Sequence, residues 1–176
     1  SDLAYEELRA AVKKTPEDYL GAKEDEAFER LGRALAASAD AQKDEEFIES
    51  DDAYLEARNR RIERLRHGCE DALRIDGDCI DAQAILALTG EGEPDDALVR
   101  LEQIEQGLDE LAPADGADLW EDAFARPRLR LLASIARTQL ETARYRRALE
   151  TCERAAALNP ADNIGIRFTW AIALAR

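Results

Sequence analysis

Methionine is absent from this chain of 176 residues, and histidine occurs only once, at His67. Because no initiator methionine is present, we expect a processed or trimmed chain. One histidine gives no convincing Ser–His or Cys–His pattern for nucleophilic catalysis, and the acidic residues are too numerous for any pair to stand out. The sequence therefore predicts no catalytic residues and a protein that is not an enzyme.

Cysteine is also scarce, with Cys69, Cys79 and Cys152 the only three. An odd number without regular spacing argues against a disulfide framework and favours a reducing compartment, so we expect a cytoplasmic protein. His67 with Cys69 and Cys79 lacks a fourth metal ligand. The run 76–81 departs from a calcium loop, since Ala87 stands where the bidentate glutamate belongs. We expect no metal and no cofactor.

Long apolar runs are missing as well. The longest, from Phe168 to Ala175, is far shorter than the ~20 residues that span a bilayer. The segment 1–14 is charged and has no apolar targeting core, so no signal peptide is expected. The sequence therefore predicts no membrane partner.

Charge is plentiful but segregated, with a net of -15 overall, -14 over 76–125 and +6 over 126–176. A smaller basic stretch, 57–75, carries a net of +3. Its Arg61 and Arg64 are predicted to face away from the apolar seam, and no aromatic residues alternate with its arginines. Since the whole chain repels phosphate, we expect no nucleic-acid partner and a solvated or ion-paired face instead.

Apolar residues recur at helical spacing, and no segment alternates with period two, which predicts an all-α fold without a sheet. A first helix is expected to end near Lys14, and a second to begin at Thr15-Pro16 and continue toward Ser38. The polar stretch 39–46 is expected to connect it to a long helix with a seam spaced by seven residues. That seam is formed by Ile48, Leu55, Ile62 and Cys69.

Glycine and proline predict where the following helices end. The long helix is expected to stop at Asp76-Gly77-Asp78, with glycine in the left-handed conformation. Shorter helices are predicted over 80–88 and from Pro94 to Leu111, and a short piece around Trp120. In the second half of the chain, one predicted helix carries an apolar stripe and is expected to end before Pro160. Asp162 is expected to cap the last helix. The members of that stripe are Tyr145, Ala148, Cys152, Ala155 and Leu158.

Two helix ends, CEDALRIDGD from Cys69 and CERAAALNPAD from Cys152, share their pattern and suggest an internal repeat. The chain here resembles the tetratricopeptide repeat family, with Ala148 and Pro160 at signature positions and Cys152 in place of an aromatic residue. In the paired helix, Gln139 stands where the family has tyrosine. The ending NPADNIGIR is also similar to a repeat ending in the suppressor of tumorigenicity 7 family and its bacterial relatives, which implies no defined activity.

The tetratricopeptide resemblance implies stacked antiparallel helical hairpins in a right-handed α-α superhelix, here with an N-terminal helical extension. We expect a single helical domain over 1–176. Its predicted parts are the N-terminal helices and long helix (1–75), a degenerate repeat hairpin (79–111), an insertion (112–126), a second repeat hairpin (127–160) and a terminal capping helix (162–176).

The resemblance further implies a concave groove that binds peptides and is lined by the first helix of each hairpin. The candidate groove-lining residues are Arg130, Ser134, Arg137, Glu141 and Arg167. We hypothesise that Arg130 and Arg137 contact an acidic peptide or carboxylate, because arginine offers planar bidentate donors. Two alternatives stay open: these arginines are solvated and paired with nearby acids, or they dock within the chain on the acidic segment 76–125.

The expected function is non-catalytic protein–protein interaction, with a peptide or protein segment bound in a helical groove. The alternative is a regulatory or sensor domain that binds a small acidic ligand. The expected partner is a protein or peptide, and a homo-oligomer is also possible.

Overall fold

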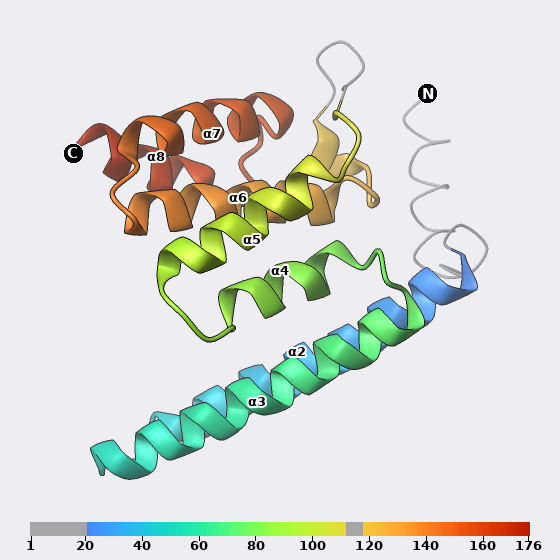
Figure 1. Ribbon diagram of the computed structural model, residues 1–176, viewed down its shortest axis with the longest axis vertical. Helices are drawn as coiled ribbons and strands as arrows, with labels where there is room; N and C mark the ends of the chain where they lie inside the picture. The colour runs from blue at the N-terminus through green and yellow to red at the C-terminus, as the bar shows by residue number, and fades with distance from the viewer. Residues whose placement is uncertain (1–20, 112–117) are drawn as a thin grey trace. The chain divides into compact units, whose positions relative to one another are not determined.

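The computed structural model describes residues 21–111 and 118–176, and every regular element in these ranges is helical (Figure 1). The all-α prediction is therefore confirmed for them. The helices predicted to end near Lys14 and to begin at Thr15-Pro16 have those ends outside the described residues. The chain forms two compact units, the first ending at Ala82 and the second running from Gln83 to Arg176. The single-domain organisation stays a prediction.

The first unit is built on a hairpin of two long helices, α2 (Ala22–Glu45) and α3 (Asp51–Ile75), which pack along each other. Small and apolar side chains fill the seam between them, including Ala27 and Leu31 from α2 and Cys69 and Ala72 from α3. The predicted spacing by seven is thus realised at Cys69. The outer end of the predicted seam is solvated, because Leu55 is exposed.

Helix α2 is longer than predicted and continues to Glu45, through all but the last residue of the segment 39–46 that was expected to be a polar connection. The reason is a tertiary contact. The side chain of Glu45, 5 % exposed, accepts a hydrogen bond at 2.8 Å from Nε of Arg61 in α3. Arg61 therefore faces the partner helix, and the prediction that it faces away from the seam is wrong. The sequence pattern assigns Glu45 to a polar loop, but in the structure its ion pair with Arg61 extends α2.

Helix α3 ends where predicted, but not by the predicted device. Gly77 is not among the residues with a positive φ. Asp76 instead turns the chain by adopting extended geometry at φ -133° and ψ 105°. Its Oδ1 then accepts a hydrogen bond from the Asp78 N–H at 3.1 Å. An aspartate turn of this kind replaces the left-handed glycine stop.

Two shorter helices follow, α4 (Ile80–Leu88) and α5 (Pro94–Gln106). The boundary between the two units falls within α4. Pro94 occupies the first turn of α5, and Glu93 and Asp96 form a reciprocal capping box around it. Helix α5 ends at Gln106, before the predicted Leu111, because the chain leaves the helix at Gly107.

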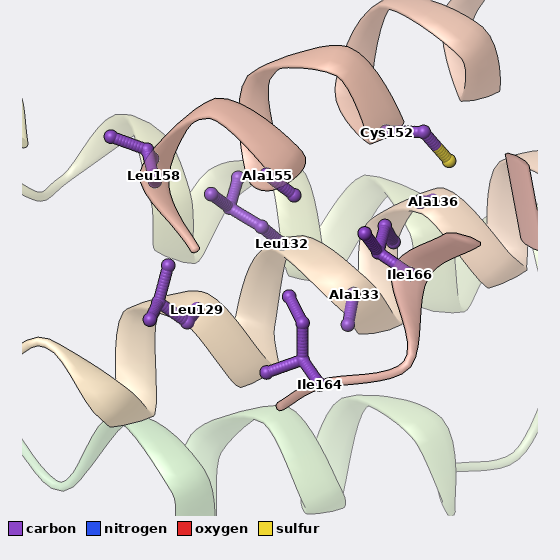
Figure 2. Packing of buried hydrophobic residues seen from close by; sticks show 9 residues of the cluster. All are labelled: Leu129, Leu132, Ala133, Ala136, Cys152, Ala155, Leu158, Ile164 and Ile166. Carbon is purple, nitrogen blue, oxygen red and sulfur yellow. The ribbon is translucent and has the colours of Figure 1, made fainter. Parts of the chain in front are cut away.

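The second unit is a stack in which α5 packs on α6 (Arg126–Glu141), α6 on α7 (Tyr145–Leu158) and α7 on α8 (Ile166–Leu174). Helix α8 also contacts α6. Figure 2 shows the core between α6, α7 and the start of α8. Its buried members are Leu129, Leu132, Ala133, Ala136, Cys152, Ala155, Leu158, Ile164 and Ile166. The α7 stripe is confirmed as a packing surface.

The end of α7 matches its prediction, since the backbone leaves helical geometry at Asn159, directly before Pro160. The start of α8 differs from its prediction, because Gly165 and not Asp162 is the N-cap residue. The Oδ1 atom of Asp162 accepts a hydrogen bond from the Ile166 N–H, the first of α8, at 2.7 Å. A neighbour-on-neighbour stack is what a helical repeat requires. The superhelical arrangement of the tetratricopeptide family stays a prediction.

Candidate functional site

The structure places four of the predicted groove residues on α6 and the fifth, Arg167, on α8. Ser134 does not face a ligand with its hydroxyl, because Oγ donates to the carbonyl oxygen of Arg130 one turn earlier at 3.0 Å. Glu141 is exposed at the end of α6. Arg130 and Ser134 are thus joined within one turn of α6, and Glu141 lies at the end of the same helix.

Two of the predicted arginines are brought together on the loop between α7 and α8. Arg137 donates from Nη2 to the carbonyl oxygen of Ile164 at 3.1 Å. Arg167 donates from Nη2 to the carbonyl oxygen of Pro160 at 2.8 Å. Both side chains stay exposed and keep further N–H donors. Their role in the fold is to satisfy carbonyls of an irregular loop.

Other arginines of the basic segment dock on acids of 76–125, through a charge ladder between α7 and α5. Three ion pairs form this ladder: Arg144–Asp95 at 2.5 Å, Arg147–Glu102 at 2.7 Å and Arg154–Glu105 at 2.5 Å. The basic segment thus pairs with the acidic segment through Arg144, Arg147 and Arg154, and docking of Arg130 and Arg137 on the acidic segment stays a prediction. The segregated net charges of the two segments were a sequence signal for this pairing. So were the spacings, because the three acids are separated by seven and three residues and the three arginines by three and seven.

A buried polar network continues the ladder into the stack. The Thr151 hydroxyl donates to Oε1 of Gln139 at 2.9 Å, and Nε2 of Gln139 donates to Glu102 at 3.2 Å. Gln139, at the family's tyrosine position, is only 3 % exposed. The network borders a hollow of 360 Å³ whose lining residues are Glu102, Glu105, Gln106, Gln139, Arg147, Glu150, Thr151 and Arg154. Since its arginines already bind glutamates, the hollow offers little positive charge to an acidic ligand.

A second polar cluster ties the insertion to the loop after α7. Asn159, fully buried, donates from Nδ2 to both carboxylate oxygens of Asp118, at 2.8 and 3.1 Å. The Trp120 and Ala161 N–H groups also donate to this carboxylate, at 2.9 and 3.0 Å. Burial raises the pKa of Asp118, but these hydrogen bonds together outweigh it and leave the pKa below its ordinary value. The cluster therefore has a structural role, because it links the predicted insertion to the loop after α7.

An exposed apolar surface lies on the outer face of α8, formed by Phe168, Ala171, Ile172 and Ala175. All four side chains are exposed, with Phe168 at 79 % and Ile172 at 49 %. The opposite side of the helix is buried through Ile166, Thr169 and Ala173. The run from Phe168 to Ala175 was noted in the sequence only for its length, and which of its side chains lie exposed was not predicted. The signal was the run 168–175, which has more apolar residues than one helix face can bury.

Two of the three thiols are buried in the packed helices. Burial raises the pKa of the Cys152 thiol to about 11. The pKa of Cys69 is also raised to about 11, mainly by burial and secondly by the neighbouring Cys79. Buried thiols with raised pKa values are poor nucleophiles. All three cysteines are free. Within 21–111 and 118–176, no group of three or more His, Cys, Asp or Glu side chains is arranged to hold a metal ion.

In the same part of the chain, none of the helices combines the length and the apolar character needed to cross a membrane. Comparisons with protein-family models, with curated proteins and with solved structures found no match to this chain.

Proposed function

We propose that this chain is a non-catalytic protein–protein interaction module. The observation that carries the proposal is the outer face of α8, where a large aromatic side chain and an isoleucine lie exposed side by side. Contiguous exposed apolar surface on a stably folded helix is typical of a binding site. Phe168 offers the kind of aromatic anchor that dominates protein interfaces.

The fold supports this proposal by holding the face rigidly. The buried side of α8 packs on α7 and α6, and the carboxylate of Asp162 fixes its start. Arg137 and Arg167 hold the preceding loop through the carbonyls of Ile164 and Pro160. A preorganised surface loses little conformational entropy on binding.

The alternative, a sensor of small acidic ligands, has less support. Such a site needs arginines that are not already neutralised, and the arginines around the 360 Å³ hollow are paired with Glu102 and Glu105. We also propose, from the sequence resemblance, that the stack α5–α8 belongs to a tetratricopeptide-like array. The free thiols fit the cytoplasmic location that we propose.

A pull-down from cells that express the protein naturally tests the proposal, with wild type compared with Phe168→Glu. We expect one protein to be retained by wild type and lost in the variant, and to bind the purified chain with fixed stoichiometry in calorimetry. Phe124→Glu is the matched control, because Phe124 is also exposed, at 59 %, but lies outside α8.

The contrary result is clear. If wild type and Phe168→Glu retain the same proteins, and small carboxylates raise the melting temperature of the chain, the sensor alternative replaces the proposal.

A further inference from the structure

We propose that the outer face of α8 binds an amphipathic helix of another protein whose apolar stripe is flanked by acidic side chains. This inference rests on the proposed function and adds the chemistry of the partner. It is carried by the shape of the apolar stripe, by the charges beside it and by an equivalent contact elsewhere in the same chain.

The spacing of the stripe is that of a helix-packing surface. Phe168, Ala171, Ile172 and Ala175 stand at i, i+3, i+4 and i+7, so they line up along one side of α8. The two alanines are small, so a partner helix can approach α8 closely beside the bulky side chains of Phe168 and Ile172. A partner helix with its own stripe at this spacing would interdigitate with the face.

The charges beside the stripe have one sign. Between residues 163 and 176 the chain carries Arg167 and Arg176 and no acidic residue. At 100° per residue, Arg167 falls beside the stripe, and Arg176 follows the end of α8. Arg167 uses one N–H of its guanidinium on the Pro160 carbonyl and keeps others for a partner. A helix flanked by carboxylates therefore complements the basic rim at Arg167.

Within this chain, α5 is an acidic amphipathic helix that packs on a neighbouring basic helix. Helix α5 carries four acids and one arginine, and its apolar side chains Leu98 and Leu101 are buried. It packs on α6, while Glu102 and Glu105 bind Arg147 and Arg154 of α7. An acidic amphipathic helix thus covers one side of α6, while α7 and α8 pack on other sides of it.

The charges also argue against a second copy of the chain as the occupant through face-to-face pairing of α8. Such a dimer would bring Arg167 of both copies to one interface without an acid on α8 to offset them. A lipid surface is the other class of occupant for an apolar face with basic rims. Helix α8, Ile166–Leu174, is short for an interfacial anchor, and Arg167 and Arg176 are few for anionic lipid.

The test uses the full chain and two designed helical peptides of about 18 residues. Both carry leucines at i, i+3, i+4 and i+7, one with glutamates on the flanks of that stripe and the other with lysines. Fluorescence anisotropy at low salt should show the glutamate peptide binding at least about tenfold more tightly. Phe168→Ala should weaken this binding at least about tenfold, while Phe124→Ala leaves it unchanged.

Each other outcome overturns the inference in its own way. Equal binding of both peptides, lost in Phe168→Ala, would remove the acidic partner but keep the proposed function. Dimers in sedimentation velocity that Phe168→Ala dissolves would assign the face to a second copy. Phe168-dependent binding to vesicles containing anionic lipid would assign it to a membrane surface. No Phe168-dependent binding up to about 1 mM glutamate peptide would reject the face as a helix site.

Discussion

At the scale of single residues, the polar side chains of this molecule are used mostly to join segments that the sequence keeps far apart. Asp118 and Asn159 are the clearest pair, since one carboxylate binds a buried amide and two backbone N–H groups. Arg137 and Arg167 act similarly on loop carbonyls. Residue types alone did not predict these roles, because each depends on a contact formed only after folding.

Asp118→Ala should therefore destabilise the fold by about 1–3 kcal/mol, since the buried amide of Asn159 loses its charged acceptor. Chemical denaturation at pH 7 measures this. Asp109→Ala is the control and should change stability by less than about 0.5 kcal/mol, because Asp109 is exposed and Arg128 binds its backbone carbonyl, which the substitution keeps.

The effect of Asp118 should depend on pH. Its folded pKa is lowered, so its contribution is full above the unfolded carboxyl pKa of about 3.9 and is lost as pH falls through the lower folded value. The difference in stability between wild type and Asp118→Ala should shrink below about pH 4. If the stability difference between wild type and Asp118→Ala stayed constant down to the lowest pH at which the protein folds, the charge of the carboxylate would not be what stabilises this cluster.

At the scale of elements, the hairpin of α2 and α3 depends on close approach. A Cβ on Gly68 would overlap the Cβ of Ala34 in α2, so this glycine is required where the helices touch. Gly32, also within a helix, has open space around its missing Cβ. The same substitution at the two positions separates packing from helix propensity.

Gly68→Ala should lower stability by about 1–2 kcal/mol, because the overlap outweighs the gain in helix propensity. Gly32→Ala should raise it by about 0.5–1 kcal/mol, since only the propensity changes. Thermal or denaturant unfolding measures both. Stabilisation by both substitutions would show that the two helices do not approach as closely as the structure describes.

The charge ladder makes a second prediction for elements. Arg154 is half exposed, so its pair with Glu105 should contribute only about 0.2–1 kcal/mol in a double-mutant cycle and less at high salt. Glu102 also accepts a hydrogen bond from the buried Gln139. Glu102→Ala should therefore cost about 1–3 kcal/mol, more than Glu105→Ala. Equal costs would mean that the buried network adds nothing to the ladder.

Elements also show how far sequence reasoning reaches. The stripe on α7 and its end at Pro160 were predictable, since both follow from local periodicity and from the geometry of proline. The length of α2 was not, because it depends on Glu45 meeting Arg61 in another helix. The exposed face of α8 was hidden for a related reason: composition shows an apolar helix but not which neighbours cover it.

At the scale of the whole molecule, the chain consists of two compact units, and the second has its own buried core, which includes the cluster between Leu129 and Ile166 and the buried Leu98 and Leu101 of α5. The fragment 78–176, which keeps α4 intact, should therefore fold alone. We expect a helical circular dichroism spectrum and one cooperative unfolding transition for it. A broad, non-cooperative transition would mean that the second unit needs the α2–α3 hairpin for its stability.

The central claim is that the outer face of α8 holds a protein partner. Site-specific photo-crosslinking from position 168 in cells that make the protein naturally tests it most directly, with position 124 as the matched exposed site. The account predicts one protein crosslinked from 168 and absent from 124. No crosslinked protein from 168, or the same products from both positions, would contradict it.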